Sequence, residues 1–352
     1  MKNDRQTKKL GEIIIENKKS ILRSKGNNDG IYPFFVSGFN VKRIDNYLTD
    51  GENIFLPTGG NFFVHYFDGK SAYSTDTWSI KTTDDVDIRY LYHYLVLNRK
   101  YIGKKLFKGA TIKHLQKNDF RDLKILIPPL SEQQRIVKIL DGVFDNIVKA
   151  KENTEKNLEN SKELFESYLQ SVFTNPGKVW DEKSLGEFIK LEYGKPLDKK
   201  YRDNNALYPV YGANGEKSRS DKFHVDRPSI IIGRKGSAGE LNITEDKFWP
   251  LDVTYFVTFD NKQHDLNFIH YLLSTLKLTK LAKGVKPGIN RNDVYSIQVN
   301  IPKTLDEQKS IVAKLDELSV KTKKLESIYK QKIADLEELK ESILQKAFTG
   351  EL

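Results

Sequence analysis

The chain of 352 residues contains an internal duplication, and this feature restricts its possible folds more than any other. Residues 118–128 match residues 292–302 with an offset of 174, and residues 130–174 match residues 305–349 with an offset of 175. Chance does not keep one register over some sixty residues. The chain therefore reads as domain, helix, domain, helix, with the second half repeating the first.

The duplicated halves are similar in the helices and dissimilar elsewhere. Short matches such as Leu10-Gly11-Glu12 with Leu185-Gly186-Glu187 extend the repeat over the whole chain. We therefore predict a first domain over residues 1–129, a helix over 130–175, a second domain over 176–304 and a second helix over 305–352. Copies that keep one scaffold and diverge elsewhere are typical of a protein with two different specificities.

Both predicted helices have recognisable starts and ends. Pro128 and Pro129 end a strand, after which Ser131 is a good N-cap and Gln134, three residues on, completes a capping box. Asp306 takes the cap position in the second copy. Asn175-Pro176-Gly177 should stop the first helix and Gly350 the second.

Apolar residues recur at four-three spacing along both helices, which is coiled-coil-like. The predicted seams consist of Ile136, Leu140, Val143, Ile147, Ala150, Leu164, Tyr168 and Val172, and of Ile311, Leu315, Leu318, Thr322, Leu325, Tyr329, Leu336, Leu339, Ile343 and Ala347. Such long helices need a partner for their apolar stripes. Equivalent helices that pair about a pseudo-twofold axis run antiparallel, whereas the alternative is two independent helices, each packed on its own domain.

The segments between the helices resemble small mixed α/β domains. Residues 53–56 and 229–232 are short apolar runs typical of buried strands, and each is followed by a polar loop that contains glycine. The predicted fold class is therefore α+β: two mixed α/β recognition domains separated by two long antiparallel coiled-coil helices, with a pseudo-twofold internal duplication.

Positive charge is concentrated outside the helices. The net charge is +10; residues 131–174 carry six basic and eight acidic side chains, and residues 306–349 carry nine of each. The other 264 residues therefore hold a net +12. A generally lysine-rich composition would explain this excess, and so would domains that face a polyanion.

The segment Gly233-Arg234-Lys235-Gly236-Ser237-Ala238-Gly239 is the most suggestive polar loop. Glycines allow backbone to approach a phosphate, and an arginine is suited to guanine O6 and N7 in the major groove. A simple surface turn is the alternative. Other polar and aromatic stretches stand at comparable places in the two copies. The residues expected to face DNA are Thr58, Asn61, His65, Lys108, Lys113 and His114 in the first copy, and Tyr211, Asn214, Lys217, Arg219, Arg234, Lys235, Ser237, Lys283, Lys286, Asn290 and Arg291 in the second.

Several catalytic signatures are missing from the sequence. There is no cysteine, which excludes disulfides, thiolate zinc sites and cysteine nucleophiles. The six histidines have no metal-ligand spacing, and neither a phosphate-binding GxxxxGK[ST] loop nor a strand-to-helix glycine fingerprint occurs. Residues 1–10 lack the apolar core of a signal peptide, and no apolar run approaches a membrane span. We therefore expect a cytoplasmic, non-catalytic protein with no cofactor or metal of its own and no contact with a membrane.

The sequence resembles the specificity subunit of type I restriction–modification systems. The residues that carry the resemblance are 118–137 with their copy at 292–312, the endings 169–174 and 344–352, the Leu185-Gly186-Glu187 opening and the Gly233 to Gly239 loop. The resemblance covers essentially the full length. It implies two target-recognition domains and an antiparallel helical spacer.

The resemblance also implies partners. Two modification subunits would bind the helices, bring S-adenosylmethionine and methylate adenine in double-stranded DNA, and restriction subunits would add ATP- and Mg-dependent translocation and cleavage. None of these cofactors would bind this chain. The candidate partner-binding residues lie near the helix ends: Glu132, Gln133, Gln134, Arg135, Phe173, Glu307, Gln308, Lys309 and Phe348.

These inferences predict a DNA-reading subunit for an asymmetric target in two parts, with the helices as a ruler. Each basic domain would enter a major groove, where all base pairs are distinguishable. Two other interpretations remain open: a coiled-coil scaffold whose domains bind protein, and a complete nuclease or methyltransferase, which the missing motifs disfavour.

Overall fold

In the computed structural model, two compact units share the chain. The structure describes residues 6–24, 29–176 and 180–352. Unit 1 comprises Met1–Glu155 and Gln331–Leu352, and unit 2 comprises Lys156–Lys330. Residues 1–5 of the N-terminal segment and Gly177 of the predicted helix stop lie outside the described residues. Each long helix contributes one part to each unit, which explains the interrupted limits of unit 1.

Unit 1 has an antiparallel four-stranded sheet, a mixed three-stranded sheet and two strand pairs. The larger sheet has the order β2 (Ile14–Glu16), β8 (Thr77–Thr82), β5 (Glu52–Pro57), β6 (His65–Asp68), and the smaller one β4 (Lys42–Ile44), β3 (Tyr32–Phe35), β7 (Ala72–Tyr73). The pairs are β1 (Gln6–Lys9) with β11 (Lys124–Ile127), and β9 (Phe107–Lys108) with β10 (His114–Leu115). The helices are α1 (Leu10–Ile13), α2 (Ile88–Leu97), α3 (Arg99–Lys105) and α4 (Lys117–Arg121).

Unit 2 repeats both sheets and the first strand pair of unit 1, and a single bridge between Lys283 and Gly288 stands in place of the β9–β10 pair. Its larger sheet has the order β13 (Ile189–Tyr193), β19 (Thr254–Phe259), β16 (Ser229–Gly233), β17 (Leu241–Thr244), and its smaller one β15 (Gly215–Ser220), β14 (Tyr208–Gly212), β18 (Trp249–Pro250). β12 (Asp181–Ser184) pairs with β20 (Gln298–Ile301). The helical segments are α6 (Leu185–Phe188), η1 (Lys199–Tyr201), α7 (Leu266–Thr275), η2 (Leu278–Leu281) and α8 (Arg291–Tyr295). The predicted duplication and the predicted strands at residues 53–56 and 229–232 are thus confirmed.

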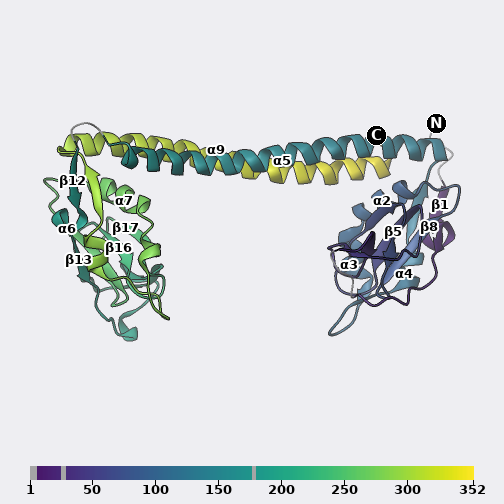
Figure 1. The fold of residues 1–352 in the computed structure, drawn as a ribbon. Helices are drawn as coiled ribbons and strands as arrows, with labels where there is room; N and C mark the ends of the chain where they lie inside the picture. Colours follow the sequence, from purple (N-terminus) through teal and green to yellow (C-terminus); the bar gives the residue numbers. More distant parts are fainter. Residues whose placement is uncertain (1–5, 25–28, 177–179) are drawn as a thin grey trace. The chain divides into compact units, whose positions relative to one another are not determined.

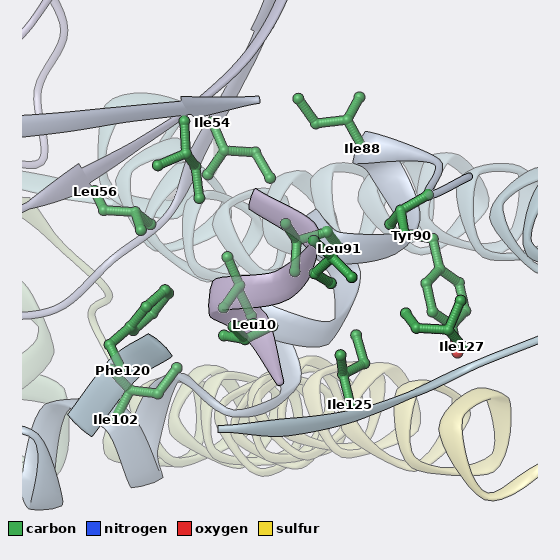
Figure 2. Close-up of a cluster of buried hydrophobic side chains, with 14 of the residues drawn as sticks. Leu10, Ile54, Leu56, Ile88, Tyr90, Leu91, Ile102, Phe120, Ile125 and Ile127 are labelled. Carbon is green, nitrogen blue, oxygen red and sulfur yellow. The ribbon is translucent and has the colours of Figure 1, made fainter. Parts of the chain in front are cut away.

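Each unit has its own hydrophobic core, to which both long helices contribute. In unit 1, Leu10, Leu56 and Leu91 pack in one cluster with Leu140 of the first long helix and Leu344 of the second; the first three are labelled in Figure 2. In unit 2, α7 packs on β16 and β17 (Figure 1). Burial of these apolar surfaces is the main contribution to the stability of each unit.

The two long helices are α5 (Leu130–Thr174) and α9 (Leu305–Thr349), each of 45 residues or about 68 Å at 1.5 Å per residue. They are antiparallel in unit 1, because Arg135 donates to the carbonyl oxygen of Leu352 at 2.8 Å whereas Lys151 pairs with Glu337 at 2.6 Å. In unit 2, Phe173 at the end of α5 shares a core with Ile311 at the start of α9. The α+β fold class with long antiparallel helices is therefore confirmed.

The predicted caps are wrong by one or two residues. α5 begins at Leu130, and the N–H groups of Glu132 and Gln133 donate to the carbonyl oxygen of Pro129. Thr304, not Asp306, caps α9: its hydroxyl accepts from the N–H of Glu307 at 3.3 Å. Ser131 and Asp306 lie within the first turns. The predicted end of α9 is confirmed, because Gly350 has a φ of 83° just beyond the helix.

Four of the predicted seam residues are exposed rather than packed: Leu164, Tyr168, Leu325 and Leu339, with exposed fractions between 37% and 52%. In α5, the buried positions of this stretch include Thr154, Ser161 and Leu169 instead. The hydroxyl of Thr154 donates to the carbonyl of Ala150, and that of Ser161 to the carbonyl of Asn157, so these small polar residues are satisfied within their own helix. These small residues thus take buried positions with their hydroxyls satisfied inside the helix.

Candidate nucleic-acid interface

The glycine loop of unit 2, residues 234–239, follows directly from the buried strand β16. Gly233 ends this strand, and a Cβ at this position would lie 2.0 Å from the carbonyl oxygen of Ser237 and 2.6 Å from that of Ala213. Only glycine allows the loop to fold back so closely on the hairpin formed by β14 and β15. The polar loop predicted from the sequence is thus fixed by a strand on one side and by this crowded glycine on the other.

A second loop is joined to the glycine loop through backbone hydrogen bonds. This basic loop of unit 2 comprises residues 283–288. Gly236 N donates to the carbonyl of Pro287 at 2.9 Å, and Ile289 N donates to that of Arg234 at 3.0 Å. Lys283 and Gly288 close the basic loop by exchanging two hydrogen bonds of 3.0 Å. The structure therefore brings together Arg234, Lys235, Ser237, Lys283 and Lys286, which are up to fifty-two residues apart in sequence.

Arg234 is held in place beside the glycine loop. Its Nε and Nη2 donate to the carbonyl of Asp252 at 3.1 and 2.6 Å. Its guanidinium lies 5.3 Å from the ring centroid of Tyr193, and the guanidinium of Arg291 lies 5.4 Å from the same ring. Two cations thus flank one tyrosine that is 47% exposed, an arrangement stabilised by cation–π attraction.

Tyr193 was missed by the sequence analysis. It ends β13, where its register partner is Tyr255, and burial raises the pKa of the Tyr255 phenol, so this hydroxyl stays protonated at neutral pH. A single exposed tyrosine has no distinctive sequence pattern. The only available signal was its place at the end of a strand next to the Gly194-Lys195 turn.

The charge balance around these two loops is positive. Lys235, Lys286 and Arg291 are exposed, and Lys283 is paired with Asp293 at 3.0 Å. Asn290 caps α8 by accepting from the N–H of Asn292 at 2.9 Å, so its side chain holds the helix that begins with Arg291. Exposed cations on glycine-containing loops are the chemistry expected for contact with phosphate and base edges.

The hairpin of β14 and β15 lies next to the glycine loop, as the contact between Gly233 and Ala213 requires. Asn214 and Lys217 are exposed near its tip. Tyr211 is half-buried against Phe248, with ring centroids 5.9 Å apart. Arg219 instead donates to the carbonyls of Ala206 and Leu207 at 2.9 and 2.6 Å, so it stabilises the entry to the hairpin.

Unit 1 holds its glycine loop, residues 58–63, with the same backbone hydrogen bonds. Gly60 N donates to the carbonyl of Lys113, and Leu115 N to that of Thr58, both at 3.0 Å. Thr58 Oγ1 donates to the carbonyl of Asp76 at 2.9 Å. Thr58 thus occupies the place of Arg234, and Asp76 that of Val253, because Thr58 N and Arg234 N donate to the carbonyls of these two residues at 2.9 and 2.8 Å.

The basic loop of unit 1, residues 108–114, carries the remaining predicted residues. Lys108 pairs with Asp119 at 2.7 Å, as Lys283 does with Asp293. Lys113 and His114 are exposed, and His114 bridges Gly59 across the two loops. Asn61 is exposed in the glycine loop itself. With Thr58, five of the six predicted residues of unit 1 thus gather on one pair of loops.

His65 differs from this group because it is packed against other side chains of unit 1. It lies on β6, with its ring centroid 5.5 Å from that of Phe35, 5.0 Å from that of Phe63 and 5.8 Å from that of Phe39. Burial lowers the pKa of its imidazole, although a hydrogen bond with the Phe39 backbone opposes this shift. His65 therefore stays neutral at pH 7 and supports the aromatic side chains around it.

Two of the predicted partner-binding residues are buried, and that interpretation is corrected. Gln133 is 0% exposed: its Oε1 accepts from Asp87 N at 2.9 Å, and its Nε2 donates to the carbonyls of Asp85 and Pro128. Gln308 is 1% exposed and makes the equivalent bond to Asp265 N at 2.9 Å. Gln133 bonds α5 to the loop before α2, and Gln308 bonds α9 to the loop before α7. Neither side chain is therefore available to a second protein.

Phe173 and Phe348 are also used within the chain. Phe173 packs at the edge of the unit 2 core, with its ring centroid 5.4 Å from that of Phe268. Phe348 packs on the unit 1 core, with its centroid 4.8 Å from that of Tyr90. The end of each long helix is thus anchored on a recognition domain.

The other partner-binding candidates lie at the surface or beside it. Arg135 is exposed and pairs with Glu132 at 2.7 Å, and Gln134 is exposed. Glu307 accepts a hydrogen bond from Trp180 Nε1 at 2.8 Å. Lys309 is exposed and lines a cavity of about 440 Å³ in unit 2. These positions remain predicted contacts.

Family comparison identifies both halves of the chain. The model of the type I restriction modification DNA specificity domain matches residues 2–160 and again residues 177–337. The chain belongs to this family.

Relatives and solved structures agree with this assignment. The chain is 26% identical to the type I restriction enzyme EcoDI specificity subunit of Escherichia coli, a match that covers 99% of this chain and 89% of the relative. It is also 26% identical to the MjaVIII specificity subunit of Methanocaldococcus jannaschii, over 99% and 93% of the two chains.

Solved structures of low sequence identity share the fold. A chain from a structure that addresses assembly and conformational transition of the type I restriction–modification system has a TM-score of 0.79, 18% identity and 99% coverage of both chains. The HsdS subunit of Thermoanaerobacter tengcongensis has a TM-score of 0.65, 18% identity and coverage of 99% of this chain and 98% of its own. The chain is thus a type I restriction–modification specificity subunit with two DNA-recognition domains.

Two further observations concern only the described residues, 6–24, 29–176 and 180–352. Among them, no helix combines the length and apolarity that crossing a bilayer requires. Within the same ranges, no cluster of three or more histidine, cysteine or acidic side chains is arranged to hold a metal ion.

Proposed function

We propose that this specificity subunit reads an asymmetric DNA target in two parts, with one recognition domain for each half-site. One observation carries the proposal: both units hold a glycine loop and a basic loop with the same backbone hydrogen bonds but present different side chains from them. An identical scaffold places each loop pair in the same way against a duplex. Different side chains on that scaffold select different bases, because the major groove distinguishes all four base pairs.

The long helices set the distance between the half-sites. Each helix of 45 residues is about 68 Å long, which is an upper limit on the separation. Half-sites one helical turn apart, about 34–36 Å, lie within this limit. Lengthening α5 and α9 by the same few residues should widen the unread spacer and leave both half-sites unchanged.

The helices also carry the surfaces for two modification subunits. Apolar side chains that are exposed on them include Val148, Leu164, Tyr168, Val320, Leu325, Ile328 and Leu339. A large apolar side chain left in water forfeits stabilisation that a partner could restore. In this proposal S-adenosylmethionine, ATP and Mg bind the partners, and this chain performs no chemistry.

Methylation mapping tests the proposal. Adenine methylation in host DNA, compared with and without the gene, should reveal one asymmetric sequence interrupted by unread bases. A continuous or symmetric target would contradict the assignment of unlike half-sites to the two domains.

An electrophoretic shift separates DNA reading from a scaffold role. Random duplex should bind at low salt and dissociate as salt rises, because phosphate contacts release counterions. A protein that binds only other proteins would show no such shift. Incubation of the purified chain with labelled S-adenosylmethionine and DNA should transfer no methyl group; transfer would show that the chain is itself a methyltransferase.

A further inference from the structure

The hairpin tip of unit 1 exposes an aromatic side chain at a position where unit 2 has glycine. Phe39 lies between β3 and β4 and is 72% exposed, and Val41 beside it is 45% exposed. Seven residues separate Phe34 from its partner Lys42 and Val210 from its partner Ser218, so by count along the chain Gly215 stands where Phe39 does. The difference therefore concerns side chains on one shared hairpin.

Phe39 is supported by the glycine loop of its own unit. Its ring centroid lies 5.8 Å from that of Phe63, edge to face, and 5.8 Å from that of His65. Phe63 and His65 are in turn 5.0 Å apart. Aromatic pairs in this geometry attract each other, so the exposed ring is held in a defined place.

The loop that adjoins this aromatic cluster exposes a lysine and a histidine. Phe63 belongs to the loop whose Gly60 N donates to the carbonyl of Lys113, and both Lys113 and His114 are exposed. Ile112, next to them, is 62% exposed. Isolated exposed apolar residues are ordinary, but here Phe39 packs on the glycine loop and Ile112 lies in the adjoining basic loop, which also exposes the cation Lys113. This charge favours a nucleic acid over an apolar protein surface as the occupant.

We propose that Phe39 of unit 1 contacts the 5-methyl group of a thymine in the major groove of its half-site. The inference rests on the proposed function and specifies its chemistry. A phenyl ring neither donates nor accepts an ordinary hydrogen bond, so it does not read the donor and acceptor pattern of a base edge. The thymine methyl is the apolar group among the major-groove edges, and phenylalanine is suited to contact it.

Replacement of thymine by deoxyuridine tests this contact, because it removes only the methyl group. Each thymine of both half-sites is replaced in turn in the mapped target duplex, and the affinity of the full chain is measured in the assembly in which it binds DNA. At one position the affinity should fall about fourfold, the loss expected when one buried methyl group is removed. Phe39→Ala should bind the thymine and deoxyuridine duplexes equally.

Two variants serve as controls. Phe39→Leu keeps an apolar side chain and should retain the preference for thymine. If Phe39→Ala fails to fold, Phe39→Leu still tests whether an apolar side chain at this position sets the preference. Tyr47→Ala removes another exposed aromatic side chain of unit 1, one that contacts Tyr32 with centroids 5.2 Å apart, and should leave the thymine preference intact.

Several outcomes would overturn the inference. They are equal wild-type affinity for thymine and deoxyuridine at every position, an undiminished preference in Phe39→Ala, or half-sites that contain no thymine. Increased 2-aminopurine fluorescence at the contacted step would show that the ring inserts between bases instead. Absence of any salt-dependent DNA binding by the wild type would contradict the proposed function itself, whereas DNA binding that is indifferent to the methyl group would contradict only this inference.

Discussion

The glycine loop of unit 2 presents Arg234 and Lys235 where that of unit 1 presents Thr58 and Gly59. Unit 2 thus exposes cations and hydrogen-bond donors at this place, whereas unit 1 exposes the ring of Phe39 beside a smaller polar loop. The backbone hydrogen bonds that hold the loops are nevertheless the same in both units.

This comparison separates the scaffold from the side chains that it presents. The scaffold is kept because its backbone groups are paired with one another and tolerate different side chains: Thr58 N donates to the carbonyl of Asp76, and Arg234 N donates to that of the equivalent Val253. The outward-facing side chains carry no such constraint. A duplicated protein can therefore diverge in what it reads without any change in how its loops fold.

The largest expected effect is that of Gly233→Ala, which should disrupt unit 2 alone. The new Cβ would meet two backbone carbonyl oxygens, at 2.0 and 2.6 Å, that cannot move independently. We expect a loss of about 3 kcal/mol in the free energy of unfolding, measured by denaturant or thermal unfolding, and loss of one half-site in methylation mapping.

The matched control is Gly142→Ala on α5, where a Cβ meets nothing within 4 Å. This variant should be neutral or slightly stabilised, because alanine favours a helix over glycine. If Gly233→Ala instead left both half-sites and the unfolding free energy unchanged, the close approach of the glycine loop would be in error.

At the helix starts, Gln133→Ala should lower the free energy of unfolding more than Gln308→Ala does. Gln133 makes three hydrogen bonds of 2.9 to 3.0 Å, whereas the contacts of Gln308 Nε2 are 3.2 and 3.4 Å long. Removing Gln133 leaves buried backbone groups unpaired, at a cost of about 2 kcal/mol.

Unfolding of the two glutamine variants measures this difference, and Gln134→Ala, at an exposed neighbouring position, should have almost no effect. Equal losses of unfolding free energy in Gln133→Ala and Gln308→Ala would show that the two sets of glutamine hydrogen bonds contribute equally, despite their different lengths.

Arg234→Ala should weaken discrimination in the unit 2 half-site by about 1–2 kcal/mol, the lower part of the range for an arginine–guanine contact, because two nitrogens of this guanidinium are bonded to Asp252. Thr58→Ala, at the equivalent place in unit 1, should have a smaller effect. Competition binding with single-base variants of the target measures both. Relaxed specificity in the opposite half-site would reverse the assignment of domains to half-sites.

The smallest effect is expected for Lys286→Ala, compared with Ile112→Ala at the equivalent place in unit 1. Loss of one phosphate contact should weaken binding to all sequences alike and reduce the slope of log affinity against log salt by about 1. Ile112→Ala should leave the slope unchanged, because it removes no charge. A sequence-dependent effect of Lys286→Ala would indicate base reading by this side chain.

The sequence by itself determined the duplication, the long antiparallel helices and the Gly233 to Gly239 loop. These follow from periodicity, from capping and turn residues, and from the matched register of two copies, which are all local properties of the chain. The predicted helix end at Gly350 shows the same, since its φ of 83° is one that glycine adopts readily.

Only the tertiary structure decided which side chains are exposed and available to a partner. Gln133 and Gln308 resemble exposed helix residues in sequence, yet they are buried because the loop before α2 or α7 supplies their partners. Leu164 fits the helical seam by spacing but is 52% exposed. Hydrogen-bond partners and neighbours of this kind come from segments far apart in the chain, so no local pattern of residues could assign them.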